Sequence, residues 1–233
     1  MPSPTIDVSP GTVVIFSDVG CPWAHAAVWR IWDARRRLGL EAKVRFDHRA
    51  FPLELFNSQA TPRDELDAEM ATCASLAPRA GWQPWAAPDW TYPVTMLPAM
   101  EAVQAAKEQG LAVSEALDRG LRRAFWGESR CISLRHVILE VASQADQLDL
   151  AALADALDSG RARRAIFDDW AVAKTDAVQG SPQFFLADGS HGQNPGLELD
   201  WHEGDDGLWR PTIVADDPTA YERLLLTAAA EAA

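Results

Sequence analysis

The segment TVVIFSDVGCPWAHAAVWRIW, residues 12–32, decides the fold of this chain. Its first part, residues 13–16, is a β-branched and aromatic run typical of a buried strand, and a turn follows it. Cys21 and Pro22 then open a stretch whose apolar residues recur at helical spacing. A second alternating stretch at residues 44–51 predicts a parallel strand, which closes a β-α-β unit. The first turn of such a unit lies at the carboxyl edge of the sheet, so the sequence predicts a functional site at Cys21.

A cysteine at the start of a helix has an unusual electrostatic setting. The unpaired backbone N–H groups and the positive end of the helix dipole favour thiolate over thiol, so we expect a lowered pKa for Cys21. Pro22 fits this position because the first helical turn tolerates a fixed φ and a missing N–H. The alternative is a buried cysteine that only packs.

The composition is that of an ordinary globular protein, and it excludes some partners. Hydrophobic residues make up 48% of the 233 residues, charged residues 24%, and the formal net charge is −13. Nucleic acids and anionic membranes both demand clustered Lys and Arg, so we expect neither as a partner. The N-terminus has no basic region and no apolar stretch long enough for a signal peptide or membrane span, which predicts a cytoplasmic location. The 3 scattered cysteines agree with a reducing compartment.

The middle of the chain loses its strand signals and predicts helices. We expect helices at residues 64–77, 96–110, 114–126, 133–144, 149–157 and 161–178. Ser133 and Asp149 are placed as N-caps. Between the first two helices lies the proline-broken aromatic segment of residues 81–93. It is either a loop packed on the helices or a lid over a ligand site.

The last part of the chain returns to β-rich sequence. Residues 180–189, GSPQFFLADG, predict a strand that begins at a proline and ends at an Asp-Gly turn. Residues 194–211 are acidic and broken by glycine. Their carboxylates lack the tight, repeating spacing of a cation loop, so we expect a solvated hairpin or loop and no metal site. Residues 217–230 close the chain as a helix with Asp217 as its cap.

Three motifs give the chain a family resemblance. Residues 17–28, SDVGCPWAHAAV, resemble the Cys-Pro-Trp-Cys active-site segment of the thioredoxin-like DsbA family, in its cytosolic branch with a large helical insertion. That branch is similar to the 2-hydroxychromene-2-carboxylate isomerases and the kappa-class glutathione transferases. Residues 125–142, FWGESRCISLRHVILEVA, resemble a recurrent segment of the helical part, and residues 180–183 resemble the segment that carries the family's cis proline.

The resemblance implies an α/β protein with a thioredoxin-like fold and an inserted all-α domain. On this basis residues 1–56 and 160–233 form the thioredoxin-like domain in two segments, and residues 57–159 form the helical insertion. The resemblance also implies a cis Pro182 that faces the active cysteine, with the N–H and C=O of Ser181 free to pair with a substrate.

One departure from the family pattern is Ala24, which stands where the family has its second cysteine. A dithiol enzyme resolves its mixed disulfide with that second sulfur, and Ala24 cannot do so. Cys73 and Cys131 are core thiols on helices, or one of them replaces the missing partner if the helical part folds over Cys21. His25 shares a helix face with Cys21. It acts on groups near the thiolate, binds a metal, or only packs, and no nearby Cys or His completes a zinc site.

The resemblance implies a bacterial, cytosolic thiol–disulfide oxidoreductase that acts through a single cysteine. Cys21 attacks a small-molecule or protein disulfide, and the residues expected to bind the thiol or substrate are Pro22, Trp23, His25, Ser181 and Pro182. We expect no tightly bound cofactor and no metal. A low-molecular-weight thiol resolves the intermediate. It is glutathione, or mycothiol if the alanine- and arginine-rich composition reflects a high-GC actinomycete. The sequence leaves a homodimer open.

Two other classes of function stay open. A thiol-cofactor-dependent isomerase or transferase uses a bound thiol without net redox change, and Ala24 favours it. A non-catalytic thioredoxin-fold binding module keeps Cys21 inert and holds a partner in its cleft or on its acidic surface. The reactivity of Cys21 separates this last class from the two enzymes.

Overall fold

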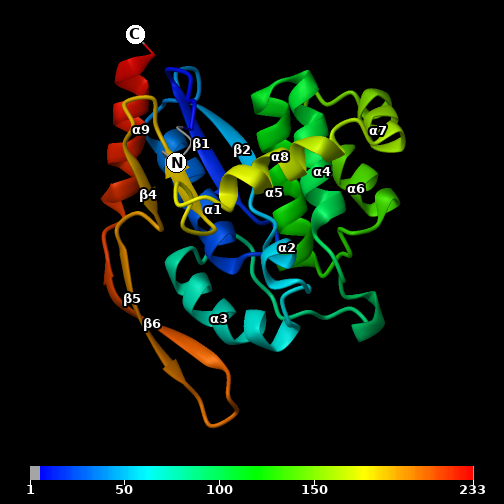
Figure 1. The fold of residues 1–233 in the computed structure, drawn as a ribbon, viewed down its shortest axis with the longest axis vertical. Coiled ribbons are helices and arrows are strands. Elements are labelled where there is room, and N and C mark those ends of the chain that lie inside the picture. Colours follow the sequence, from blue (N-terminus) through cyan, green and yellow to red (C-terminus); the bar gives the residue numbers. More distant parts are fainter. Residues whose placement is uncertain (1–5, 233) are drawn as a thin grey trace.

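Strand β1 (Thr12–Ser17) lies at the centre of the protein, whose computed structural model describes residues 6–232. It pairs in parallel with β2 (Arg45–Ala50) and antiparallel with β3 (Gln183–Phe185), which pairs antiparallel with β4 (His191–Gln193). The order β2-β1-β3-β4 joins the N-terminal β-α-β unit to strands from far along the chain (Figure 1). The strands predicted in these segments are confirmed.

The remaining elements are helices and a second small sheet. In chain order the helices are α1 (Pro22–Arg37), α2 (Leu53–Asn57), α3 (Arg63–Leu76), η1 (Asp89–Thr91), α4 (Leu97–Ala106), η2 (Lys107–Gln109), α5 (Leu111–Glu128), α6 (Arg135–Ala142), α7 (Leu150–Ser159), α8 (Arg163–Ala173) and α9 (Thr219–Glu231), where η marks a 3-10 helix. The second sheet is an antiparallel hairpin of β5 (Leu197–Glu203) and β6 (Trp209–Asp216). The helical middle of the chain is therefore as predicted.

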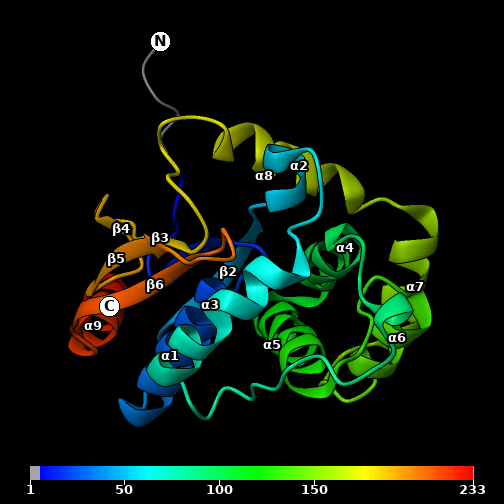
Figure 2. The same ribbon diagram turned by 90° about the horizontal axis from the view of Figure 1, so that it is seen from below.

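The two faces of the four-stranded sheet are buried by different partners. Because side chains alternate along a strand, Val13 and Ile15 of β1 face one way, and Val14 and Phe16 face the other. Val13 and Ile15 pack with residues of α1 and α9, which lie side by side (Figure 2). Val14 and Phe16 pack in a second cluster with Phe51, Ala173, Val178 and Phe185. Burying each of these large side chains stabilises the fold by roughly 1.5–3 kcal/mol.

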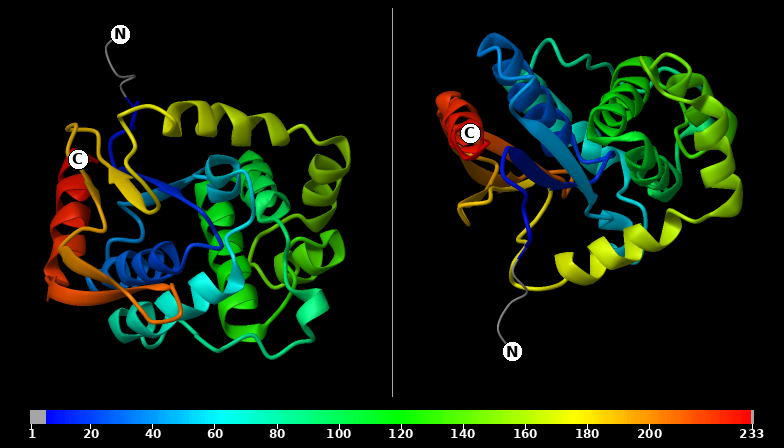
Figure 3. Two further views of the ribbon diagram at one scale, coloured as in Figure 1. Left: turned by 60° about the horizontal axis from the view of Figure 1, so that its bottom comes forward. Right: turned by 90° about the horizontal axis from the view of Figure 1, so that it is seen from above.

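Helices α4 and α5 form the middle of the helical part and pack beside the sheet at β2. Met100 of α4 and Leu117 of α5 are buried in one apolar cluster that also contains residues of α6 and α7. Gln104 of α4 donates a hydrogen bond of 3.0 Å to the main-chain oxygen of His48 in β2. The helical part and α9 thus lie on opposite sides of β2 (Figure 3), and α5 can reach the end of β1.

Two predicted helix starts differ from the structure. Ser133 is not an N-cap, because its hydroxyl donates to the main-chain oxygen of Thr95 at 2.6 Å and α6 begins two residues later. Helix α5 begins three residues before the predicted Ser114. Asp149 is confirmed as the cap of α7, since its carboxylate accepts from two main-chain N–H groups of the first turn. The hydrogen bond of Ser133 is therefore made with a residue distant in sequence, whereas the hydrogen bonds of Asp149 are made within its own helix.

The β5–β6 hairpin was expected as a hairpin or loop, and the structure shows where it lies. It forms a sheet separate from the four strands around β1. The hairpin packs on α3, where Thr72 Oγ1 donates to the main-chain oxygen of Pro211 at 3.1 Å. Figure 1 shows its turn projecting beyond α3. The hairpin thereby reaches the region around the start of α1.

Candidate active site

Cys21 lies where the turn after β1 enters α1, as predicted. It is the N-cap residue of the helix, with an extended backbone (φ −83°, ψ 121°), and Pro22 follows it in the first turn. The Cys21 thiol donates a hydrogen bond to the main-chain oxygen of Ser181, 3.3 Å away. These residues are 160 positions apart, so the fold brings together the two motifs that the sequence singled out.

The thiol of Cys21 is buried, with only 4% of the residue exposed. It belongs to an apolar cluster with Trp23 and Cys73, against which Leu197 and Leu199 of the hairpin pack. Burial raises the pKa of Cys21 to about 12, and hydrogen bonds that favour the thiolate offset this only in part. The prediction of a lowered pKa is wrong for this structure. Burial of the sulfur destabilises the thiolate, because it loses hydration, by more free energy than the helix N-terminus contributes to stabilising it.

Ser181 contacts the cysteine turn through two of its atoms, and its peptide bond with Pro182 is cis. The main-chain oxygen accepts from the Cys21 thiol, and the Oγ accepts from the main-chain N–H of Asp18 at 2.9 Å. The expectation of a free Ser181 carbonyl therefore differs from the structure, because the thiol occupies it. A substrate N–H that pairs with this carbonyl would share it with the thiol or replace the thiol.

Asp18 is a buried carboxylate in the cysteine turn. Its two oxygens accept from the main-chain N–H groups of Gly20, at 2.7 Å, and Leu53, at 2.9 Å, which ties the turn to the start of α2. Burial raises the pKa of Asp18 to about 6, although these hydrogen bonds and the Arg122 charge lower it. The turn that carries Cys21 is thus held by α2 as well as by Ser181.

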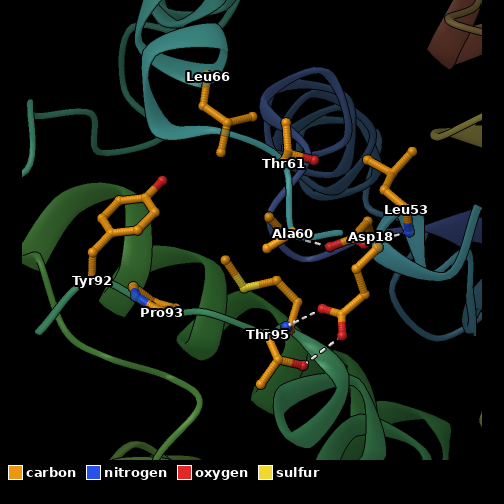
Figure 4. Close-up of a pocket in the computed structure, with 11 residues that line it drawn as sticks. Asp18, Leu53, Ala60, Thr61, Leu66, Tyr92, Pro93 and Thr95 are labelled. Carbon is orange, nitrogen blue, oxygen red and sulfur yellow. Dashed lines mark hydrogen bonds between the residues drawn. The ribbon is translucent and has the colours of Figure 1, made fainter. Parts of the chain in front are cut away.

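A small pocket opens beside this turn, next to the start of α4 (Figure 4). Asp18 lies on one side of it and Tyr92 on the other, and Glu54 also lines it. Glu54 accepts from Thr95 Oγ1 and from the main-chain N–H of Met96, both at 2.6 Å, so it serves the first turn of α4. Both carboxylates are occupied by hydrogen bonds within the chain, and the pocket mainly offers an apolar wall.

Arg122 of α5 holds the cysteine turn from the helical part, and only 1% of it is exposed. It donates to the main-chain oxygen of Asp18 at 2.9 Å and to Ser17 Oγ at 2.8 Å. Its ion pair with Asp118 has a distance of 2.8 Å. Burial is the largest single influence on the pKa of Asp118 and acts to raise it, but the charge and hydrogen bonds of Arg122 together with two nearby histidines lower the pKa of that carboxyl overall. The end of β1 is therefore anchored by a buried, charged side chain.

Trp23 connects the elements that cover Cys21. Its Nε1–H donates to Glu69 Oε2 of α3 at 2.6 Å. Its ring meets the ring of Trp201 of the hairpin edge to face, with centroids 5.9 Å apart. Burial raises the pKa of Glu69 to about 7. The side chain that follows the Cys-Pro pair is thus clamped by both α3 and β5.

His25 lies one turn after Cys21 and is buried between two tryptophans. Its ring stacks on Trp126, with an interplanar angle of 16°, and meets Trp82 edge-on at a centroid distance of 4.5 Å. Burial lowers the pKa of His25 to about 3, so the ring is neutral at physiological pH. Within the described residues its Nε2 has no hydrogen-bond partner. This environment agrees with the packing alternative for His25 and disfavours a cationic role at the thiolate.

The aromatic segment of residues 81–93 packs on the helical part. Trp85 and Tyr92 contact each other and Phe125 of α5. Trp90 is 86% exposed. Tyr92 and its neighbour Pro93 also line the pocket of Figure 4. The segment therefore packs on the helices, as the first interpretation expected, and its end lines one wall of a pocket, whereas a lid over a ligand site stays a prediction.

The other two cysteines differ in their surroundings. Cys73 is fully buried in the cluster of Cys21, whereas Cys131 is half-buried and lies just before α6. All three cysteines are free thiols. Among residues 6–232 no group of three or more His, Cys, Asp or Glu side chains is arranged to hold a metal ion. The same residues contain no helix that is long and apolar enough to cross a bilayer.

Sequence reasoning missed the buried polar side chains around the turn. Asp18 had a local signal, because an aspartate two positions before a glycine commonly accepts the turn's main-chain N–H. Glu69 and Arg122 had none. They lie on helices of the middle segment, and the face that each helix turns toward Cys21 is set by tertiary packing.

One comparison with known proteins shows the family of this chain. The family model described as the DSBA-like thioredoxin domain matches residues 12–199. A search of curated proteins finds no match. The matched range contains both β1 and the Ser181–Pro182 segment, and the whole helical part between them.

Several solved structures share the fold. The cytosolic disulfide reductase DsbM from Pseudomonas aeruginosa, solved with GSH, has a TM-score of 0.63 and 17% identity, covering 93% of this chain and 98% of that chain. A structure described as a probable DsbA oxidoreductase from Streptomyces coelicolor has a TM-score of 0.64 and 19% identity, covering 94% and 90%. A 2-hydroxychromene-2-carboxylate isomerase has a TM-score of 0.53 and 17% identity, covering 78% and 87%. At these identities the likeness shows the fold.

Proposed function

The chain belongs to the family of the DSBA-like thioredoxin domain, and from this premise we propose that it is a thiol–disulfide oxidoreductase whose attacking sulfur is Cys21. The predicted family and the α/β, thioredoxin-like fold with added helices are confirmed. The observation that carries the proposal is the hydrogen bond between the Cys21 thiol and the carbonyl of Ser181, beside a cis proline. The sulfur at the start of α1 therefore lies next to a main-chain carbonyl that can also accept a hydrogen bond from a bound substrate.

The reaction begins when the Cys21 thiolate attacks a disulfide R–S–S–R′. A bond forms between Cys21 Sγ and one substrate sulfur, and the other sulfur leaves as a thiolate that takes up a proton. The Ser181 carbonyl, released by the thiol, accepts from a main-chain N–H of the bound substrate. Pro22 and Pro182 shape the backbone around the sulfur, and Trp23 forms its rim. His25 supports Trp82 and Trp126 behind the site.

The resting state of this reaction is a protonated, covered thiol. Burial raises the pKa of Cys21 to about 12, so attack requires that the cluster around Cys21, against which Leu197 and Leu199 of the hairpin pack, opens to solvent or substrate. Solvent or substrate then replaces the apolar cover, and the N-terminus of α1 stabilises the thiolate. We place the control of reactivity in the contact between the hairpin and the start of α1.

The co-substrate that we propose is a low-molecular-weight thiol, glutathione or mycothiol, acting in the cytoplasm. The DsbM structure contains GSH, which supports a glutathione-like thiol here. The C-P-W-A motif supports it as well, because Ala24 provides no sulfur to complete the exchange. Substrates are small-molecule or protein disulfides.

The division into a two-segment thioredoxin-like domain and an insertion at residues 57–159 belongs to the same proposal.

A second candidate is an isomerase or transferase that uses a bound thiol without net redox change. Ala24 and the fold shared with the 2-hydroxychromene-2-carboxylate isomerase favour it. It differs from the first candidate because no disulfide forms at Cys21 during turnover.

The test uses the reduced protein, glutathione and hydroxyethyl disulfide as substrate. We expect steady turnover that Cys21→Ser abolishes and that Cys131→Ser leaves unchanged, because Cys131 lies outside the Cys21 cluster. Mass spectrometry of acid-quenched samples should show a disulfide at Cys21. Full activity in Cys21→Ser contradicts the proposal. Saturable glutathione binding without any Cys21 disulfide points to the isomerase or transferase instead.

A further inference from the structure

Cys73 belongs to the same buried cluster as Ala24, the position that lacks a sulfur in the C-P-W-A motif. Residues three apart on a helix are neighbours, so position 24 adjoins Cys21 on α1. Ala24 places only a methyl group there. Cys73 of α3 belongs, with Ala24, to the cluster that encloses Cys21, and none of Cys73 is exposed. Helix α3 therefore contributes a second thiol, that of Cys73, to the buried cluster that contains Cys21.

Helix α3 is fixed against the start of α1 by polar and apolar contacts. The hydrogen bond from Trp23 to Glu69 joins the two helices one turn before Cys73. The small residues Ala77 and Ala80 lie in the same cluster, which lets the chain after α3 approach α1 closely. Figure 2 shows α3 running alongside α1. The position of Cys73 thus follows from a packed interface between two helices.

Electrostatics agrees with the placement of both thiols in one buried cluster. Burial is the main cause that raises the pKa of Cys73, and the charge of Cys21 is the next, ahead of Glu69. Glu69 lies four residues away on the same helix, and an electrostatic effect falls with distance. The Cys21 sulfur therefore acts on Cys73 at least as strongly as a helical neighbour does.

We propose that Cys73 is the resolving cysteine of this protein. The proposal rests on the thiol–disulfide function assigned to Cys21 and supplies a step that Ala24 cannot perform. In the mixed disulfide Cys21–S–S–R, the Cys73 thiolate attacks Cys21 Sγ. A Cys21–Cys73 bond forms, the bond to R–S breaks, and R–S⁻ leaves and takes up a proton. Two electrons and two protons have then passed from the two cysteines to the substrate disulfide.

The external thiol acts one step later in this scheme. Two molecules of glutathione or mycothiol reduce the Cys21–Cys73 disulfide, and they leave as their own disulfide. Cys131 takes no part, because it lies outside the cluster.

The experiment follows the fate of the first adduct. Reduced full-length protein is mixed with oxidised glutathione, and samples are acid-quenched, alkylated and analysed by intact mass and peptide mapping. Wild type should pass rapidly to a Cys21–Cys73 disulfide without a lasting adduct. Cys73→Ala should keep one glutathionyl group on Cys21 at least 10-fold longer, while the matched control Cys131→Ala should behave as wild type.

The outcomes separate this inference from the proposed function. A wild-type glutathionyl adduct that lasts as long as that of Cys73→Ala overturns the role of Cys73 and leaves the function of Cys21 standing. Absence of both adduct and disulfide at Cys21 overturns both. Circular dichroism checks that Cys73→Ala is folded, and Cys73→Ser is a second variant. The peptide map of wild type decides the linkage even if both variants fail to fold.

Discussion

The Cys21 thiol donates a hydrogen bond to the main-chain oxygen of Ser181, which lies 3.3 Å away and 160 positions further along the sequence. This contact joins the N-terminus of α1 to the segment before β3 and orients the sulfur within a closed apolar cluster. The thiol stays protonated because burial raises the pKa of Cys21 to about 12, and a hydrogen bond with the Ser181 side chain offsets this only in part.

The first prediction concerns the pH dependence of alkylation at Cys21. With a pKa raised to about 12 by burial, the thiolate fraction of the native protein grows about tenfold per pH unit through neutral and mildly alkaline pH. We expect the rate with iodoacetamide to rise up to pH 10 without a plateau, whereas the unfolded protein levels off above about pH 9. A native plateau below pH 7 contradicts the covered, protonated state.

The second prediction concerns the aromatic contact between Trp23 and Trp201. Trp201→Ala removes an edge-to-face pair worth about 0.5–1.5 kcal/mol, so the hairpin should uncover Cys21 more often. Alkylation of Cys21 at pH 8 should accelerate about 2- to 10-fold. Trp209→Ala, on the same hairpin and 55% exposed, is the matched control and should leave the rate unchanged. Equal rates in the two variants contradict a cover formed by β5.

The third prediction concerns the buried arginine of α5. Arg122→Ala leaves Asp118 charged and unpaired in the interior, so the free energy of unfolding should fall by about 3–5 kcal/mol. The neighbouring Arg123 has 75% of its side chain exposed, and Arg123→Ala should change stability by no more than about 0.5 kcal/mol. Urea denaturation monitored by tryptophan fluorescence compares the two. Similar losses in both variants contradict the anchoring role of Arg122.

The fourth prediction concerns Glu69. Burial raises its pKa from an ordinary value of 4.5 to about 7, so the folded state binds this proton more tightly than the unfolded state. The free energy of unfolding should therefore decrease as pH rises from 4.5 to 7, by up to about 3 kcal/mol from this group. Glu69→Gln keeps an oxygen for Trp23 and should remove this component.

The control for Glu69 is Glu41→Gln at an exposed position between α1 and β2. Its urea denaturation series between pH 4.5 and 7 should follow wild type. If Glu69→Gln also follows wild type, then the carboxyl of Glu69 does not carry the proton that the buried site predicts.

The sequence predicted the parts of the fold that depend on local pattern. The strand predicted from the β-branched and aromatic run of residues 13–16, the Cys-Pro helix start and the cap at Asp149 are all in the structure, because each is decided by nearby residues. The prediction of Ser133 as a cap is wrong, because its hydroxyl donates a hydrogen bond to the main-chain oxygen of Thr95, which is distant in sequence.

The candidate site was predictable in its members but not in its chemical state. Cys21 and Ser181 were singled out by motif, and the fold joins them. The raised pKa of Cys21 could not be foreseen, because it depends on Leu199 and on α3, whose positions follow from tertiary packing. Arg122 was invisible for the same reason, as an arginine on a helix is ordinarily solvated.

The hairpin that covers Cys21 is a sheet of its own, hydrogen-bonded within itself. Lifting β5 from the Cys21 cluster therefore separates the apolar side chains of Leu197 and Leu199 from it and leaves the ladder around β1 intact. The strength of such a contact depends on temperature, and it weakens on cooling. Cooling should therefore loosen the packing of the hairpin while the central sheet stays folded. The exposure of the Cys21 thiol at low temperature then depends on a few leucine and tryptophan side chains.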